Sequence, residues 1–278
     1  MSTIAEVVVV VFLVASMAGI GLRVSAAEVR EALRLRGFLG RALVANFLVI
    51  PMIGVALTRL VPMQPELAVA FVLLACSPGG PSALQFTSKQ QTALAHAGIT
   101  AFVLSLLAVF LTPLLVQLAL PRGTSLVVPY GRVFWLFFLL LLAPLGLGML
   151  LRSLAPALAG RIARPVVLAS TLAFFAFIGL TLALRRTNMA ALKTEALLAL
   201  LAFVLVSMAI GWLLGGPGRP GRRVLATASS MRNVALCLAI ARHSFPGTDI
   251  EVPLVAFSAL MIPPNMAFFL VTRLSEKR

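Results

Sequence analysis

The hydrophobic pattern of this chain is a series of apolar segments of about 20 residues, separated by short stretches that hold most of the charges. Nine such segments occur, at about 3–22, 39–60, 67–88, 92–120, 131–151, 164–184, 194–214, 223–242 and 251–273. A helix needs about 20 apolar residues to span a ~30 Å hydrocarbon core. The pattern therefore predicts an all-α membrane protein with about nine transmembrane helices. Because no stretch is long and polar enough for a separate soluble domain, we expect residues 1–278 to form one domain.

The composition agrees with a membrane protein. The chain has 278 residues, of which 61% are hydrophobic and 11% are charged, whereas soluble domains contain about 25% charged residues. Its net charge of +15 does not indicate nucleic-acid binding, because the basic residues lie in short connections: 15 follow odd-numbered segments and 7 follow even-numbered ones. By the positive-inside rule, this asymmetry predicts a cytoplasmic C-terminus and an external N-terminus. We expect an integral protein of a bacterial inner (cell) membrane, surrounded by lipid and without a nucleic-acid partner.

Two segments carry interruptions in comparable places. The third contains CSPGGP at 76–81, where two prolines remove helix donors and adjacent glycines favour non-helical torsions. The eighth contains ASSMRN at 228–233, a run of small and polar residues. A pair of interrupted segments in corresponding halves is typical of inverted-repeat transporters with a binding site near the midplane. We therefore predict a first repeat of four spans over 1–120 and a second of five spans over 131–273.

Arg232 is a fixed charge inside an apolar segment. A cation at membrane depth is costly unless it faces a polar cavity, forms a pair or meets an ionic ligand, so Arg232 is a functional-site hypothesis. Its guanidinium is permanently charged and offers bidentate donors to an anion. The alternative is a structural role, in which Arg232 snorkels toward the cytoplasmic end or pairs with backbone carbonyls.

Cysteine and histidine usage indicates no cofactor. Cys76 and Cys237 both lie in apolar segments, where free cysteines behave as small buried hydrophobes. The sequence has no metal-ligand spacing and no cofactor motif, and no nucleophile–base or acid pair lies within the apolar segments. We therefore expect no metal site, no cofactor and no enzymatic activity.

Several local motifs resemble the bile acid:sodium symporter superfamily. They are MAGIGL at 17–22, NFLVIP at 46–51, CSPGG at 76–80 with LTPLL at 111–115, and MRNVAL at 231–236. The resemblance extends over essentially the whole chain. It implies a fold of two inverted five-helix repeats, with two broken helices that cross near the middle. Because the similarity begins at the family's second helix, we expect the first family helix to be missing, which agrees with nine spans and an external N-terminus.

The sequence departs from this family where sodium-coupled members bind cations. The resemblance implies a glutamate in the second crossing segment, but residues 223–242 contain no acid, and Arg232 stands at the family's glutamine position. Ala83 and Leu84 stand where the family has a serine–asparagine pair, and Asn46 stands at another glutamine position. Since a Na⁺ site needs several convergent hard oxygen ligands, we hypothesise that Arg232 substitutes for the coupling ions. Dependence on Na⁺ is then expected to be weak or absent.

The leading functional interpretation is a secondary transporter that moves a small organic anion by alternating access. Two alternatives stay open: a binding or sensing protein that kept the transporter fold, and an oxyanion exporter resembling the arsenite permeases of the same superfamily. An anion would be held partly by Arg232 and by half-helix N-termini. The candidate substrate-binding residues are polar or helix-breaking: Asn46, Pro78, Gly79, Gly80, Gln85, Ser229, Ser230, Arg232, Asn233 and Asn265. Asn265 follows Pro263 and Pro264, a pair that we expect to distort the ninth span.

Overall fold

The protein is described by a computed structural model, which covers residues 3–25, 35–79, 91–120, 131, 135, 138–184, 192–245 and 247–274. Within these ranges the chain is helical and contains no strand. The elements are α1 (Thr3–Gly21), α3 (Arg36–Val44), the π-helix η2 (Ala45–Val49), α4 (Ile50–Leu60), α5 (Pro65–Cys76), α6 (Gln91–Ala119), the π-helix η4 (Phe138–Leu142), α8 (Ala143–Leu154), α9 (Pro156–Leu184), α11 (Thr194–Leu214), α12 (Arg219–Ser230), α13 (Val234–Ser244), α14 (Glu251–Leu260) and α15 (Ile262–Leu274). The predicted all-α class is confirmed.

In the described ranges, six helical stretches are long and apolar enough to cross a membrane: Arg36–Leu60, Ala97–Ala119, Pro156–Leu180, Thr194–Leu214, Arg219–Arg242 and Glu251–Leu274. Three apolar helices are shorter, namely Val7–Gly21, Pro65–Cys76 and Phe138–Leu154. All of them overlap predicted segments, although the count of nine spans and the inverted repeats stay predictions. The helix predicted to start at about 164 begins earlier, at Pro156, because a proline is well tolerated in the first helical turn.

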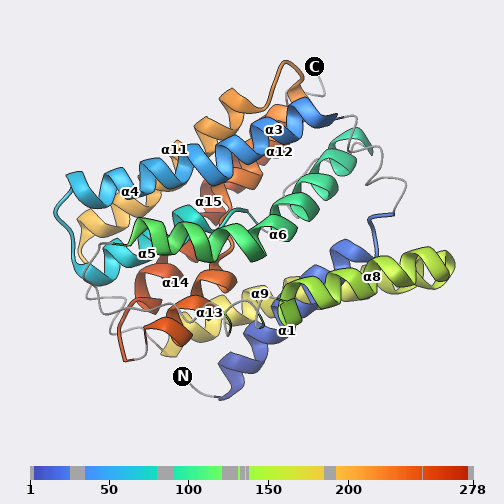
Figure 1. The fold of residues 1–278 in the computed structure, drawn as a ribbon, viewed down its shortest axis with the longest axis horizontal. Helices are drawn as coiled ribbons and strands as arrows, with labels where there is room; N and C mark the ends of the chain where they lie inside the picture. The colour runs from blue at the N-terminus through green and yellow to red at the C-terminus, as the bar shows by residue number, and fades with distance from the viewer. Residues whose placement is uncertain are drawn as a thin grey trace.

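The helices form two packed groups (Figure 1). In one group, α1 packs along both α8 and α9. In the other, α4 packs on α5, α11 packs on α12, and α14 contacts both α5 and α13. Contacts of η4 with α6, and of α9 with α14, join the two groups. The first group therefore lies beside the second and leaves both interrupted helices within the second.

The span made by α12 and α13 lies in the protein interior. In its most apolar part, 94% of the residues are buried, compared with 28–56% in the other five long spans. Large apolar side chains on outer helices are instead exposed, such as Leu118, Leu147 and Leu172. Exposed apolar side chains of this kind are expected where helices face lipid. The interrupted span is thus surrounded by other helices.

Prolines divide or widen several helices. The last span breaks between α14 and α15, at Met261, next to Pro263 and Pro264, so the predicted distortion of the ninth span is confirmed. An unpredicted feature is that η2 and η4 are wound as π-helices, and each ends two residues before a proline, Pro51 or Pro144. A proline has no N–H to donate to the preceding turn, and a wider turn accommodates this loss.

α1 and α8 approach each other closely through glycines. A Cβ added at Gly148 would lie 2.7 Å from the carbonyl oxygen of Ala18 and 2.9 Å from the backbone nitrogen of Leu22. A Cβ added at Gly21 would lie 2.9 Å from the backbone nitrogen of Met149. Small residues at such contacts let helix backbones pack tightly in membrane proteins, where hydrophobic burial does little to hold helices together.

We predict that Gly148→Val lowers the melting temperature of the purified protein, because the added methyl groups must push α1 and α8 apart at a cost of about 1–3 kcal/mol. Thermal unfolding in detergent measures the effect. Gly146→Val is the matched control on the same helix, since a Cβ at Gly146 would meet no atom within 4 Å. Equal melting temperatures for the two variants would contradict the close packing.

Candidate functional site

Both predicted interruptions are breaks in the structure. Residues 77–79 follow α5, residues 231–233 separate α12 from α13, and neither stretch is helical. Ser77 (φ −106°, ψ 94°) and Met231 (φ −89°, ψ 90°) are extended. The two breaks meet directly, because the backbone N–H of Asn233 donates a hydrogen bond to the carbonyl of Ser77 over 3.4 Å. The broken helices therefore cross at these residues.

Gly79 lies against the end of α12. A Cβ built at Gly79 would overlap the carbonyl oxygen of Ala228 and would lie 2.8 Å from the carbonyl oxygen of Met231. A residue without a Cβ is the one that fits between these two backbones. The glycine therefore serves the close approach of the first break to α12.

α5 ends inside the protein, so its last carbonyl groups need donors from outside the helix. Four consecutive carbonyls find such donors, those of Leu74, Ala75, Cys76 and Ser77. Arg232 donates to the first two, over 2.8 Å from its Nε in the case of Leu74. The hydroxyl of Thr112, on α6, donates to the third over 2.9 Å, and the N–H of Asn233 donates to the fourth. The end of α5 is thus satisfied by α6 and by the other broken helix.

The guanidinium of Arg232 is enclosed by oxygen atoms. Arg232 is 1% exposed, and it is the one charged residue in the buried class among residues that the structure describes. Besides its bonds to the end of α5, its Nη1 donates to Oδ1 of Asn46 over 2.8 Å and to the carbonyl of Ser229 over 3.3 Å. These four hydrogen bonds engage most of the five N–H groups of a guanidinium. Arg232 is therefore paired inside the protein with carbonyls and an amide, and it does not snorkel.

Two asparagines hold the end of α12. Asn46, in η2, donates from Nδ2 to the hydroxyl of Ser229 over 3.1 Å while its Oδ1 accepts from Arg232. Asn265, in α15, accepts from the hydroxyl of Ser230 over 2.8 Å. Both asparagines and both serines are fully buried. The π-turn at η2 and the break before α15 thus flank the crossing with amide groups.

The structure brings most of the predicted site residues to this crossing or beside it: Asn46, Pro78, Gly79, Ser229, Ser230, Arg232, Asn233 and Asn265. Gly80 and Gln85 lie outside the described residues. Contact of any of these residues with a substrate stays a prediction. Cys76 and Cys237 are buried free thiols, as predicted.

Sequence reasoning missed several groups that complete the site. Thr112 was not predicted as a site residue, although a hydroxyl beside Pro113 at membrane depth is a usable signal. The carbonyls of Leu74 and Ala75 carry no side-chain signal, because every residue has one. They become predictable only once the helix is known to end at Cys76 with an arginine nearby.

The site has the character of a cation held by neutral oxygen dipoles. The oxygen atoms that bind Arg232 come from three backbone carbonyls and one amide, and none comes from a carboxylate. In the described part of the chain, no group of three or more His, Cys, Asp or Glu side chains gathers in a way that suits a metal ion. The arrangement supplies fixed positive charge, with most of its hydrogen-bond donors already engaged, and the described residues of the crossing contain no acid–base pair.

We predict that Thr112→Val destabilises the protein by about 1–3 kcal/mol, because it leaves the buried carbonyl of Cys76 without its donor. Thermal unfolding in detergent measures the loss. Thr58→Val is the control, since the hydroxyl of Thr58 bonds within its own helix, to the carbonyl of Val55. A loss no larger than that of the control would show that Thr112 does not support the end of α5.

Comparisons with known proteins identify the family of this chain. The model of the Sodium Bile acid symporter family matches residues 10–192, which is more than half of the chain. A protein of Bacillus subtilis (strain 168), named "Uncharacterized sodium-dependent transporter YocS", is 26% identical over 259 residues, which cover 90% of this chain and 78% of that protein. Membership of a symporter family implies a transporter rather than an enzyme. The resemblance in the sequence motifs is confirmed: this chain is an integral membrane protein that belongs to the Sodium Bile acid symporter family.

Proposed function

We propose that the protein is a secondary transporter that moves a small organic anion by alternating access, with weak or absent dependence on Na⁺. The observation that carries this proposal is the position of the Arg232 guanidinium between the two breaks. It donates hydrogen bonds to the carbonyls of Leu74 and Ala75, at the C-terminal end of a half-helix. Half-helix C-terminal ends and unwound carbonyls are the groups that coordinate Na⁺ in transporters with broken helices. The fixed cation of Arg232 thus lies among groups that are suited to bind a mobile cation such as Na⁺.

The electrostatics of the crossing support occupation by a built-in charge. The C-terminal end of a helix carries a partial negative charge of about −0.5, which favours a cation there. Asn46 adds an amide oxygen to the same guanidinium. Arg232 therefore supplies at the crossing the positive charge that a bound sodium ion supplies in sodium-coupled transporters. No carboxylate takes part in its hydrogen bonds.

The same geometry bears on how an anion would be held. Four hydrogen bonds already engage the Arg232 guanidinium, so its attraction for an anion acts mainly through charge. The N-terminus of α13 lies directly after the second break, and the side chain of Asn233 caps it by accepting from the N–H of Leu236 over 3.2 Å. A helix N-terminus and a nearby cation both favour negative charge. We place the anion site at this end of the crossing.

The proposal retains the predicted architecture. Nine spans would form repeats over 1–120 and 131–273, with the N-terminus outside and the C-terminus in the cytoplasm. In support, a break follows α5 before the long helix α6, and a break in α12–α13 precedes α14 and α15. The relative from Bacillus subtilis is named as sodium-dependent, so this chain would differ from it in coupling.

The first test is flux. In proteoliposomes that contain the purified chain, uptake of a panel of labelled organic anions should proceed at similar rates with a Na⁺ gradient and with a choline gradient. Protein-free liposomes are the control. Strong stimulation by Na⁺ would contradict the substitution by Arg232. Binding of an anion without flux would favour a sensor, and flux of arsenite alone would favour an oxyanion exporter.

The second test asks whether the guanidinium occupies a cation site. Arg232→Gln removes the charge and leaves the surrounding oxygens, so we expect Na⁺, but not choline, to raise the melting temperature of the variant by mass action. The wild type and Arg161→Gln, a change at an exposed arginine of α9, should show no such shift. If Arg232→Gln does not fold, the double variant Ser229→Glu/Arg232→Gln, prepared in Na⁺, adds a carboxylate that can hold Na⁺ in place of the lost guanidinium. A folded variant that is indifferent to Na⁺ would overturn the proposed substitution.

A further inference from the structure

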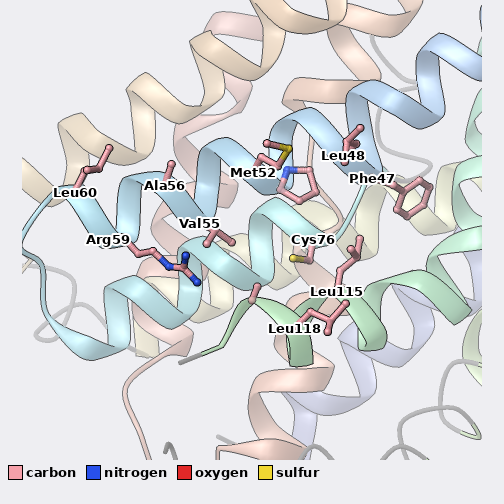
Figure 2. A pocket seen from close by; sticks show the side chains of 12 residues that line it. Phe47, Leu48, Met52, Val55, Ala56, Arg59, Leu60, Cys76, Leu115 and Leu118 are labelled. Carbon is pink, nitrogen blue, oxygen red and sulfur yellow. The ribbon is translucent and has the colours of Figure 1, made fainter. Parts of the chain in front are cut away.

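An apolar groove runs along the outside of the larger helix group. Its volume is about 510 Å³. Figure 2 shows the side chains that line it, which come from η2 and α4 on one side and from α6 on the other, with Cys76 at the end of α5 between them. The lining residues are Phe47, Leu48, Pro51, Met52, Val55, Ala56, Arg59, Leu60, Cys76, Leu115, Leu118 and Ala119.

The lining of the groove is almost entirely apolar. Apart from Arg59, each of these residues presents an apolar or thiol side chain. Residues at the rim are open to the surroundings, with Leu48 at 54%, Met52 at 63% and Leu118 at 71% exposure. In a protein that spans a membrane, such a rim faces the hydrocarbon of the bilayer. The groove is therefore accessible to lipid chains from the side.

Arg59 gives the groove a polar end. It lies in the last turn of α4, where the span ends, and its side chain is exposed. Within the described residues it has no ion pair or hydrogen bond, and Glu66 at the start of α5 does not pair with it. Figure 2 shows Arg59 and Leu60 at one end of the row of lining side chains and Phe47 at the other. At 1.5 Å per residue, this row extends over roughly 18 Å of helix.

We propose that this groove binds an anionic phospholipid, with one acyl chain along α4 and α6 and the phosphate at Arg59. The groove is long and apolar, it opens sideways to the bilayer, and it ends at the unpaired guanidinium of Arg59. Its apolar part matches an acyl chain, and the guanidinium matches the phosphate. A guanidinium forms strong, bidentate hydrogen bonds with phosphate oxygens. Net negative charge on the headgroup adds attraction, which distinguishes phosphatidylglycerol from phosphatidylcholine, since basic residues near the surface attract anionic lipids.

The bound chain would lie against the end of α5. Cys76 lines the groove, and its carbonyl is the one that Thr112 of α6 holds. An acyl chain between α4 and α6 would fill the space beside this hydrogen bond. The lipid would thus support the first break, which links the anionic lipid content of the membrane to the stability of the crossing.

Native mass spectrometry of the full-length purified protein tests the proposal. Delipidated protein is titrated with dioleoyl phosphatidylglycerol or dioleoyl phosphatidylcholine, which share acyl chains and differ in headgroup charge. The wild type should retain phosphatidylglycerol preferentially, and Arg59→Gln should weaken that preference about fivefold, as expected for the loss of one basic contact. Arg161→Gln, at an exposed arginine of α9, should retain it. Equal retention of phosphatidylglycerol by the wild type and Arg59→Gln would overturn the proposal.

A second pair of variants tests the apolar part of the groove. Ala56→Trp places a large ring in the groove at an exposed position and should reduce binding of both lipids. Leu147→Trp, at a residue that is 67% exposed on α8, should leave binding unchanged. If Arg59→Gln instead raises the KM for a transported anion and leaves lipid retention intact, the groove belongs to the substrate, and the lipid assignment is wrong.

Discussion

The hydrogen bonds between the Arg232 guanidinium and the last carbonyls of α5 are the interaction on which the rest of the structure depends. A helix that ends inside a membrane protein leaves carbonyl groups that cannot turn to water, and each costs free energy if it stays unpaired. Here Arg232, Thr112 and the N–H of Asn233 satisfy these groups. In return, the carbonyls and Asn46 satisfy a buried charge that has no acidic partner among the described residues. The unpaired carbonyls and the buried guanidinium would each cost free energy alone, and the hydrogen bonds between them remove both costs.

These mutual hydrogen bonds explain why the two breaks lie side by side. The donors for the end of α5 lie on the second broken helix, so α5 can end at Cys76 only if α12 ends beside it. Gly79 permits the required approach, and the serines of α12 are held by Asn46 and Asn265 from neighbouring helices. The helices that pack around α12 and α13 keep water from competing for these bonds, which is consistent with the deep burial of that span. The crossing is therefore one cooperative unit.

The sequence predicted those parts of this unit that have distinctive side chains. An arginine in an apolar run, prolines with glycines, and amides at membrane depth all break the hydrophobic pattern, and Arg232, Gly79 and Asn265 were found in that way. The identity of the paired carbonyls was beyond such reasoning, because the backbone of Leu74 is the same as that of any leucine. The π-turn around Asn46 was also missed, since it reflects how one helix adapts to Pro51 in its tertiary context and has no periodic signal of its own. The early start of α9 shows the same limit, because arginines within a helix resemble those of a loop.

The covalent attachment of Arg232 has a thermodynamic consequence under the proposed function. A sodium ion travels across the membrane with its substrate and brings the energy of its own gradient, whereas a side chain stays with the protein and completes no net movement. An anion carried alone would then move its own charge through the membrane potential. For a monovalent anion, an inside-negative potential of about 100 mV favours the outward direction by about 2.3 kcal/mol. The replacement of a mobile ion by a fixed one would thus change the direction in which the membrane drives the cargo: such a carrier would release an anion from a polarised cell and would import it only down a steep concentration gradient.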